Sequence, residues 1–445
     1  MGGYLAYTEY KDSGVEWLGK IPSHWDVKRL KFISTVQPSN VDKKSDDNEE
    51  SILLCNYSDV YNNTEITSNL EFMRATATQS EIKKFLIAKG QVIVTKDSET
   101  REDIAVPAYV AEDFENVLCG YHLTQIKPEN IFGKYIFRLF QSRQFNAQFI
   151  LGANGVTRFG LPQYIISNAF TTIPPLEEQK SIARFLDYKT AQIDALIAKK
   201  EALLEKLAEK RTALISQAVT KGCDPTVPMK DSGIEWLGEI PEHWEVKRLK
   251  FVVEEIIDTP HKTAPYDDNG GFLVARTTNV RNGRLLLNDA KFTDEKTYRE
   301  WTSRAIPEPG DILFTREAPA GEACLVPAVP KLCLGQRMVL SKFDHNRYDG
   351  YFLLQSIYSG IADEFIRSLS LGSTVSHFNM SDIGSIPLIL PPHKEQKRIS
   401  FWLSKQISFY DNQIEKVELA IEHLREYRID VRDIKLPELE SVETA

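Results

Sequence analysis

Side chains of the types that recognise DNA bases are concentrated in one short stretch of the second half of the chain. In VARTTNVRNGRLLL (274–287) arginines alternate with threonine and asparagine, and the stretch contains no acidic residue. An arginine can donate two hydrogen bonds to guanine, and an asparagine can pair with adenine, in the major groove of DNA. We therefore predict that this stretch contacts bases, with the candidates Arg276, Thr278, Asn279, Arg281 and Arg284.

The corresponding stretch in the first half is polar but not basic. In LLCNYSDVYNNTEI (53–66) the candidates are Asn56, Tyr57, Tyr61 and Asn63. Three further candidate positions occur in matched pairs, one member from each half: Lys96 with Arg316, His122 with Arg337, and Arg158 with His377. For any single residue an ordinary surface role is the more common outcome, so the predicted DNA interface depends on the whole set.

A catalytic centre is not indicated by the sequence. It lacks the phosphate-binding GxxxxGK[ST] loop, the zinc-binding HExxH motif and the nucleophile motif GxSxG. His24 and His243 each precede a tryptophan in a repeated PxHW, but no repeated partner that could act as base or nucleophile stands out. We therefore expect no catalytic and no metal-binding residues, and a structural role for the two histidines.

The elements that must position these candidates occur twice. KDSGVEWLGKIPSHWDVKRLKF (11–32) recurs as KDSGIEWLGEIPEHWEVKRLKF (230–251), with changes only at Val15/Ile234, Lys20/Glu239, Ser23/Glu242 and Asp26/Glu245. Each of these segments, called an opening here, is followed by a variable body and then by a PP…EQ segment, at 173–186 and 390–403. Within the bodies KGQVIVTKD matches PGDILFTRE, and FRLFQS matches FLLQS. Two copies suit a pseudo-symmetric pair of domains rather than a solenoid, with Trp17, Ile21 and Trp25 anchoring the first opening.

Each body is predicted to be a mixed α+β domain. Short runs rich in β-branched and aromatic residues, such as QVIVT, IAVPAYV, DILFT and MVLSKF, predict strands broken by glycine, proline and asparagine. The stretches SEIKKFL and KYIFRLFQS predict helices.

Each half then ends in a long helix with an apolar stripe. The predicted stripe residues are Ile182, Leu186, Ile193, Leu196, Leu203, Leu207 and Leu214 in the first helix, and Leu403, Ile407, Tyr410, Ile414, Val417, Ile421, Leu424, Arg428 and Val431 in the second. Steps near three and four are typical of a coiled coil. We expect the two helices to pair with each other, because such long stripes exceed those of helices that pack only on their own domain.

The overall composition is that of a globular chain with an acidic balance. The 445 residues carry a net charge of −9, which argues against a chain that neutralises DNA phosphates unaided. The sequence contains no run of 18 apolar residues, so we expect no membrane span. The five cysteines lack CxxC spacing and indicate a reducing compartment, so we expect a cytoplasmic protein.

The chain has a duplicated GxEWLGxIPxHWxVKRLKF opening, a GDILFTR-like strand and a duplicated PPxxEQ segment before each long helix. In these features it resembles the DNA-specificity subunit of type I restriction–modification enzymes, over nearly the whole chain. The resemblance implies two target-recognition domains, each for one half of a split DNA sequence, joined and separated by two long antiparallel coiled-coil helices. It implies as partners double-stranded DNA, two methyltransferase subunits and restriction/translocase subunits. Those partners would perform catalysis and bind S-adenosylmethionine, ATP and Mg, and this chain would bind none of them.

From the repeat and the helices we expect recognition domains at 1–174 and 223–390, spacer helices at 175–222 and 391–436, and a tail at 437–445.

Two other functions are open from the residues alone. One is a coiled-coil scaffold with two ligand-binding modules that do not act on DNA. The other is a self-contained nuclease or methyltransferase, for which the acid-Val-Lys triplets at 26–28 and 245–247 are a weak indication.

Overall fold

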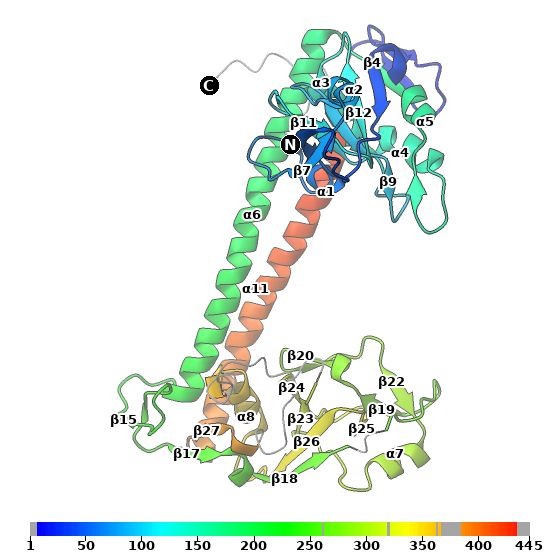
Figure 1. Cartoon of the computed structure of the whole chain (residues 1–445). Helices are drawn as coiled ribbons and strands as arrows, with labels where there is room; N and C mark the ends of the chain where they lie inside the picture. The colour runs from blue at the N-terminus through cyan, green and yellow to red at the C-terminus, as the bar shows by residue number, and fades with distance from the viewer. Residues whose placement is uncertain (1–6, 260–261, 318–320, 362–363, 366–383, 434–445) are drawn as a thin grey trace. The chain divides into compact units, whose positions relative to one another are not determined.

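The computed structural model describes residues 7–259, 262–317, 321–361, 364–365 and 384–433 (Figure 1). The chain forms two compact units. Unit 1 consists of Met1–Lys199 and Ala420–Ala445, and unit 2 of Lys200–Leu419. The long helices α6 (Leu176–Lys221) and α11 (His393–Asp433) therefore each contribute to both units. In the described part of the chain no helix is long and apolar enough to cross a membrane.

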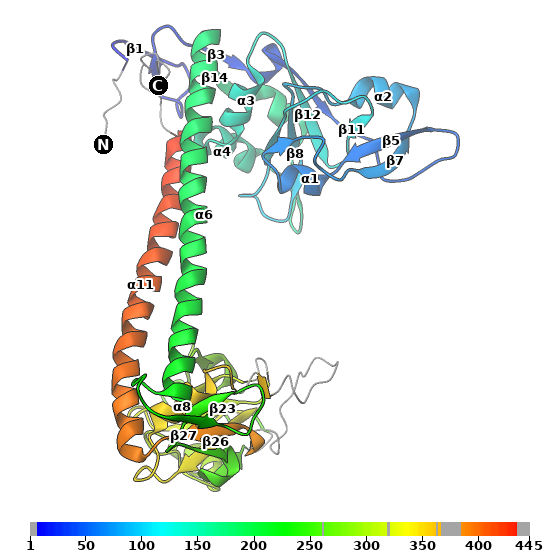
Figure 2. The ribbon, with the colours of Figure 1, turned by 90° about the vertical axis from the view of Figure 1, so that its left-hand side faces the viewer.

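Unit 1 contains a five-stranded and a three-stranded sheet, with the five-stranded sheet nearer to α6 (Figure 2). The larger sheet has the order β4-β12-β8-β10-β6, formed by Ser34–Pro38, Leu123–Pro128, Val92–Thr95, Pro107–Val110 and Glu65–Ile66. The smaller sheet has the order β11-β5-β7, formed by Val117–Cys119, Glu50–Cys55 and Met73–Ala77. Three antiparallel pairs join β1 (Tyr10–Asp12) to β2 (Lys20–Pro22), β3 (Asp26–Arg29) to β14 (Phe170–Ile173), and β9 (Asp97–Ser98) to β13 (Phe159–Gly160). The shorter helices are α1 (Tyr57–Tyr61), α2 (Gln79–Phe85), α3 (Gly133–Phe140), α4 (Arg143–Gly152) and α5 (Gln163–Asn168).

The strands and helices predicted for the first body are confirmed, and their composition explains them. Strands β8 and β10 are buried along their whole length, which is why they are continuous apolar runs rather than alternating ones. The predicted helix SEIKKFL is α2. It begins with a capping box, in which Thr78 Oγ1 accepts the Glu81 N–H and the Glu81 carboxylate accepts the Thr78 N–H.

Unit 2 repeats this plan with a different body. Its four-stranded sheet has the order β18-β26-β23-β24, formed by Val253–Asp258, Met338–Phe343, Ile312–Thr315 and Ala323–Leu325. Its three-stranded sheet has the order β22-β19-β25, formed by Lys291–Thr293, Phe272–Ala275 and Leu332–Leu334. The pairs are β15 (Met229–Asp231) with β16 (Glu239–Pro241), β17 (Glu245–Arg248) with β27 (Pro387–Leu390), and β20 (Val280–Arg281) with β21 (Arg284–Leu285), and the shorter helices are α7 (Glu295–Trp301) and α8 (Gly350–Ile357). The predicted α+β class, with two pseudo-symmetric units, is confirmed.

A close contact between two glycines recurs in both units. A Cβ on Gly133, the first residue of α3, would lie 1.8 Å from Gly90 O. A Cβ on Gly350, the first residue of α8, would lie 2.5 Å from Gly310 O. Only glycine allows the main chains to approach so closely. The two contacts therefore define which residues of the two bodies correspond.

The glycine contacts correct one match made from the sequence. Counted from Gly133 and Gly350, Tyr135 corresponds to Phe352. The match of FRLFQS with FLLQS, which paired Phe137 with Phe352, was wrong by two residues. That match was based on the similarity of the two short sequences. The structural correspondence depends instead on the first residue of each helix, which contacts the preceding loop.

Helix α6 begins directly after two prolines and ends before a glycine. Glu177 and Glu178 lie in its first turn, where carboxylates interact favourably with the helix dipole. Gly222, which follows the helix, has a φ of 78°, the left-handed conformation that commonly ends a helix.

The buried stripe of α6 differs from the predicted one in its middle. Ile193 is buried as predicted, but Leu196 and Leu203 are exposed, while Ile197 is buried and Leu204 half-buried. The stripe is thus displaced by one residue, about 100° around the helix. In α11 every predicted stripe residue is buried or half-buried.

Two ion pairs join α6 to α11. In unit 1 Arg428 donates to Asp194 over 2.6 Å, and in unit 2 Arg211 donates to Asp411 over 2.9 Å. From the first ion pair to the second, the residue number on α6 rises by 17, from Asp194 to Arg211, and the residue number on α11 falls by 17, from Arg428 to Asp411. The helices are therefore antiparallel, as predicted. Asp194 and Asp411 both lie 16 residues after the EQ glutamate, so the pairs are copies of one contact.

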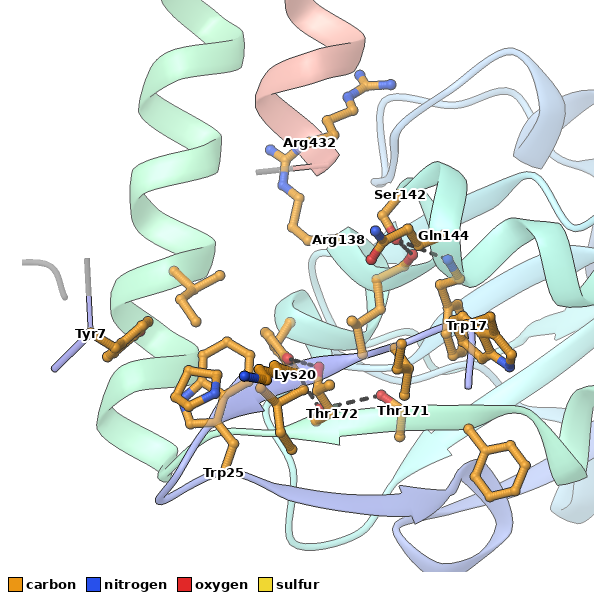
Figure 3. A pocket seen from close by; sticks show the side chains of 18 of the residues that line it. Tyr7, Trp17, Lys20, Trp25, Arg138, Ser142, Gln144, Thr171, Thr172 and Arg432 are labelled. Atoms are coloured by element: carbon orange, nitrogen blue, oxygen red, sulfur yellow. Dashed lines mark hydrogen bonds between the residues drawn. The ribbon is translucent and has the colours of Figure 1, made fainter. Parts of the chain in front are cut away.

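The EQ glutamate holds each opening on its long helix. In unit 1 Glu178 accepts a hydrogen bond from Trp25 Nε1 over 3.1 Å and contacts His24 Nε2 at 2.9 Å. Trp25 and Ile21 are buried, as expected of anchors, whereas Trp17 is exposed, because its ring lies in the loop between β1 and β2. Trp17 is therefore covered less than the other two, although its side chain lines a pocket together with Phe145 and Phe170 of the body (Figure 3).

Unit 2 repeats the contact with the same residue types. Glu395 accepts a hydrogen bond from Trp244 Nε1 over 3.3 Å and contacts His243 Nε2 at 2.8 Å. The repeated histidines thus bond to the helix that follows their body, which explains why the PxHW and EQ motifs are duplicated together.

The glutamine of each EQ pair holds the body. Gln179 accepts the N–H of Phe132, the residue before α3, over 2.8 Å. Gln396 accepts the N–H of Asp349, the residue before α8, over 2.9 Å. Opening, body and long helix therefore meet at one dipeptide in each unit.

Candidate nucleic-acid interface

Two tyrosines of the first body present a stacked pair of rings. Tyr57 and Tyr61 lie one turn apart on α1, with ring centroids 5.4 Å apart and planes inclined by 16°. The N–H of Asn56, the residue before the helix, donates to Asp59 Oδ2 over 2.7 Å. Asn63 Nδ2 donates to Asp59 O over 2.9 Å. The two asparagines therefore hold α1 in place, and the tyrosines offer ring faces and hydroxyl groups to a ligand.

The charge of Arg158 acts on Tyr57 in the folded chain, although the two residues lie far apart in sequence. The Tyr61 hydroxyl donates to Asp103 Oδ2 over 2.5 Å. Burial raises the pKa of Tyr57 and Asp103 raises it further, whereas the positive charge of Arg158 lowers it. Arg158 is exposed, on the turn that precedes β13. Tyr57 thus contacts the ring of Tyr61 and interacts electrostatically with Arg158.

Lys96 and His122 are joined through the main chain where β8 ends and β12 begins. The Lys96 N–H donates to His122 O over 3.0 Å, and His122 Nδ1 lies 2.6 Å from Asp97 Oδ2. Lys96 Nζ donates to Ser39 O over 3.1 Å and lies 4.4 Å from the centre of the Tyr121 ring. Burial lowers the pKa of Lys96, and the nearby Asp97 opposes this effect.

The second body repeats this arrangement with arginines. The Arg316 N–H donates to Arg337 O over 3.0 Å, and Arg337 Nε lies 3.2 Å from Glu317 Oε2. Arg316 Nη1 donates to Asp258 Oδ2 over 2.7 Å. The two pairs of positions matched from the sequence therefore coincide in the two folds. Their contact with DNA stays a prediction.

In both bodies an acidic side chain accompanies the two basic positions. We call Lys96, Asp97 and His122 cluster 1, and Arg316, Glu317 and Arg337 cluster 2. The two acids and the exposed ring of Tyr121 were not among the residues predicted from the sequence. A signal for the acids was present, because the matched strands end in Lys-Asp and Arg-Glu.

The acid-free stretch of the second body begins as a tight turn. Asn279 is fully buried; its amide donates to Leu286 O over 3.0 Å, and its Oδ1 accepts the Arg276 N–H over 3.2 Å. Arg276 Nη2 donates to Asp289 O over 2.5 Å, and Thr278 is exposed. Contrary to expectation, Asn279 shapes the loop and offers no group to a base in this conformation.

The hairpin that follows holds its two arginines on protein groups. Asn282 and Gly283, between β20 and β21, have φ angles of 51° and 80°, which is the turn that Asn-Gly favours. Arg281 Nη1 donates to two main-chain carbonyl oxygens, over 2.7 and 3.0 Å. Arg284 Nη2 donates to Asp411 Oδ2 of α11 over 2.5 Å. Arg284 thus pairs with the long helix while 64% of its side chain stays exposed, and its contact with DNA stays a prediction.

The predicted residues divide into three groups that are exposed or half-buried and several residues that support the fold. The groups are the tyrosine pair with Arg158, cluster 1 and cluster 2. His377, the predicted counterpart of Arg158, lies outside the described residues. Within the ranges that the structure describes, no group of three or more His, Cys, Asp or Glu is arranged to hold a metal ion.

The chain is similar to known specificity subunits over most of its length. A family model described as the type I restriction modification DNA specificity domain matches residues 22–206 and again 241–423. The putative type I restriction enzyme MjaX specificity subunit of Methanocaldococcus jannaschii is 24% identical over 403 residues, which cover 89% of this chain and 89% of that protein. The EcoKI specificity subunit of Escherichia coli K12 is 23% identical over 415 residues, which cover 89% of this chain and 85% of that protein.

Solved structures share the fold. The HsdS subunit from Thermoanaerobacter tengcongensis has a TM-score of 0.52 at 16% identity, covering 94% of this chain and 97% of that one. A chain from a structure on complex assembly and conformational transition of the type I R-M system has a TM-score of 0.69 at 15% identity, covering 94% of this chain and 98% of that one. At such identities the likeness concerns the fold alone, and it agrees with the two-unit architecture.

Proposed function

Since the chain belongs to the family of type I restriction modification DNA specificity domains, whose model matches it twice, we propose that each body recognises one half of a bipartite, asymmetric DNA site. The chain is a DNA-recognition specificity subunit and has a non-catalytic role. The two halves of the site differ because the two bodies differ.

The observation that carries this proposal is the coincidence of clusters 1 and 2. Both are built on the same main-chain bond, from the end of one strand to the residue before the next. One offers a lysine and a histidine, and the other offers two arginines. A common frame with different hydrogen-bonding groups is what recognition of two different base sequences requires.

The acid in each cluster gives a further reason for specificity. A carboxylate that holds a basic side chain reduces the number of conformations that this side chain can adopt. A donor held in one orientation distinguishes base pairs better than a mobile one, because less conformational entropy is lost on binding. Arginine in cluster 2 suits the two acceptors of guanine, and the tyrosine rings beside cluster 1 suit apolar contact with thymine methyl groups or sugars.

We also propose that the length of α6 and α11 sets the number of unrecognised base pairs between the two half-sites. The helices are continuous, and the duplicated Asp–Arg ion pairs hold them in one register. A change in helix length is therefore transmitted along the pair rather than absorbed by slippage.

The two openings are the proposed docking surfaces for two methyltransferase subunits. Phe32 and Phe251 occupy matched positions and are 68% and 67% exposed, and exposed lysines precede them in both copies. Two closely similar exposed surfaces on one chain suit two copies of one partner. The methyltransferase subunits would bind S-adenosylmethionine and supply much of the phosphate neutralisation that a chain of net charge −9 lacks.

The restriction/translocase subunits would bind ATP and Mg and join the same complex, which we place in the cytoplasm. The alternative of a scaffold that does not act on DNA is not supported by the family to which the chain belongs.

An exchange experiment tests this function. Residues 33–170 are replaced by the first body of a relative, the chain is produced with its methyltransferase, and methylated adenines are mapped across the genome. We expect a bipartite methylated motif whose first half changes and whose second half does not. A change in both halves would contradict independent recognition, and a parent complex that methylates no defined motif would contradict the function itself. Reciprocal exchange of the second body is the matched control.

A further inference from the structure

A short turn joins the smaller sheet to the larger sheet in each unit. In unit 1 residues 120–123 connect β11 to β12 (Figure 2), and in unit 2 residues 335–338 connect β25 to β26. Both turns close with the same bond. The N–H of the fourth residue donates to the carbonyl oxygen of the first, over 3.1 Å in unit 1 and 3.3 Å in unit 2. The central residues are Tyr121 and His122 in unit 1, and Gln336 and Arg337 in unit 2.

Matched main-chain contacts hold the two turns on both sides. The Gly120 N–H donates to Cys55 O over 2.9 Å, and the Gly335 N–H donates to Ala275 O over 2.7 Å. A Cβ on Gly120 would lie 2.7 Å from Cys55 O, and one on Gly335 would lie 2.8 Å from Ala275 O, so only glycine fits. On the other side, the main-chain bond of cluster 1 or cluster 2 ties the turn to the end of β8 or β23. Each turn therefore lies between the basic strand end and the strand that leads into the candidate stretch.

The first central residue of each turn is exposed and belongs to neither cluster. Tyr121 is 51% exposed, and its ring centre lies 4.4 Å from Lys96 Nζ and 5.0 Å from the centre of the His122 ring. Gln336 is also exposed, and its Oε1 accepts a hydrogen bond from Thr263 Oγ1 over 3.4 Å. A bond of this length is weak, so a base can replace Thr263 as the partner of the amide.

The two matched side chains are neutral and differ in their chemistry. A glutamine amide can donate to N7 of adenine and accept from its N6 amino group, a pattern that distinguishes adenine from guanine in the major groove. A tyrosine ring cannot form this pair, but it offers an apolar face to the methyl group of thymine. One main-chain frame thus presents two side chains that suit different bases.

We propose that the first central residue of this turn contacts a base in both units, and that Gln336 selects adenine at one position of the second half-site through its amide. Tyr121 contacts a base of the first half-site through its ring. This inference rests on the proposed function and extends it, because it assigns one base to one residue that lies outside the two clusters.

Fluorescence anisotropy of the chain bound to its methyltransferase tests the proposal, at one fixed salt concentration. The duplexes carry the methylated motif, each with one base pair changed. Gln336→Ala should reduce the preference for adenine at one position of the second half-site by roughly 5- to 160-fold and leave the first half-site unchanged. Gln336→Glu keeps the shape but removes the amide donor, and should lose the same preference. Asn346→Ala is the matched control, because Asn346 is an exposed amide beyond the opposite end of β26, and it should discriminate like the parent.

Two variants of Tyr121 extend the test to unit 1. Tyr121→Phe retains the ring and should discriminate like the parent, whereas Tyr121→Ser should relax one position of the first half-site only. Parental discrimination in Gln336→Ala, or equal weakening of all duplexes, would overturn the proposal and leave the proposed function standing. A lost preference for a base other than adenine would overturn it as well. A parent complex that prefers no sequence would overturn both the proposal and the proposed function.

Discussion

Replacing Arg337 by alanine should relax recognition at one base pair of the second half-site and leave the fold intact. The Arg337 side chain is 50% exposed and that of Glu317 is 32% exposed, so water screens their ion pair. Loss of such a pair changes the free energy of unfolding by less than about 1 kcal/mol. A base-contacting arginine contributes about 1–3 kcal/mol to discrimination between base pairs, which is roughly 5- to 160-fold in the ratio of dissociation constants.

Fluorescence anisotropy measures this effect with the chain bound to its methyltransferase, on duplexes that differ at one base pair and at one fixed salt concentration. Arg299→Ala is the matched control, because Arg299 lies in the same unit and pairs with Glu295 on its own helix α7, outside cluster 2 and the candidate residues. It should retain the discrimination of the parent. His122→Ala changes the position equivalent to Arg337 in the first body and should affect only the first half-site.

Two results would contradict a base contact by Arg337. If Arg337→Ala weakens binding of all duplexes equally, the side chain contacts phosphate rather than a base. If it changes neither affinity nor discrimination, cluster 2 lies outside the interface. The double variant R337A/E317Q removes the acid that the single variant leaves without its arginine. Recovery of discrimination in the double variant would assign the effect to the repulsion of Glu317 rather than to a lost base contact.

Other perturbations test the supports of the site. Glu178→Ala leaves Trp25 Nε1 without its acceptor and should lower the free energy of unfolding, measured by urea denaturation, by about 1–3 kcal/mol. Glu178→Gln should lower it less. A larger loss in Glu178→Gln than in Glu178→Ala would contradict the role of the carboxylate. Burial lowers the pKa of Lys96 in the folded chain below 10.5, its value in the unfolded chain. Between these two pKa values the unfolded chain binds more protons than the folded chain, so the free energy of unfolding should rise with pH. Lys96→Met should remove this slope in denaturation curves, and an unchanged slope would assign it to other groups. Insertion of four residues after Lys199 lengthens α6 by about 6 Å. It should widen the unrecognised gap by one or two base pairs in maps of methylated adenines, whereas a methylating variant with the original gap would show that other elements set the spacing.

The architecture could be predicted because its signals are local and repeated. The duplicated openings and PP…EQ segments identify two equivalent units, and the spacing of apolar residues identifies two long helices. The phase of the stripe in the middle of α6 could not be chosen in this way. Leu196 is followed by Ile197, and Leu203 by Leu204, so two adjacent stripes are equally apolar. Contact with other parts of the fold decides which of them is buried.

The positions of the candidate site residues could be predicted from the sequence better than the residues that they contact. The matched strand ends located Lys96, His122, Arg316 and Arg337, because the two bodies keep the order of their strands. The acids beside them carried a weaker signal. Asp97 and Glu317 follow basic residues directly in sequence, but only the fold shows that each bonds to the basic residue of another strand end.

The order of residues alone shows that the chain has two similar halves, that each contains an α+β body and a long helix, and which residue types each body offers to a ligand. Repetition, periodicity and residue type are properties of neighbouring positions, so they are visible in the sequence. Only the fold shows which groups the candidate side chains contact. Asn279 is buried under its own turn, and Arg284 pairs with Asp411, which lies 127 residues further along the chain. Such contacts depend on distances in space between residues remote in sequence, and no local pattern records them.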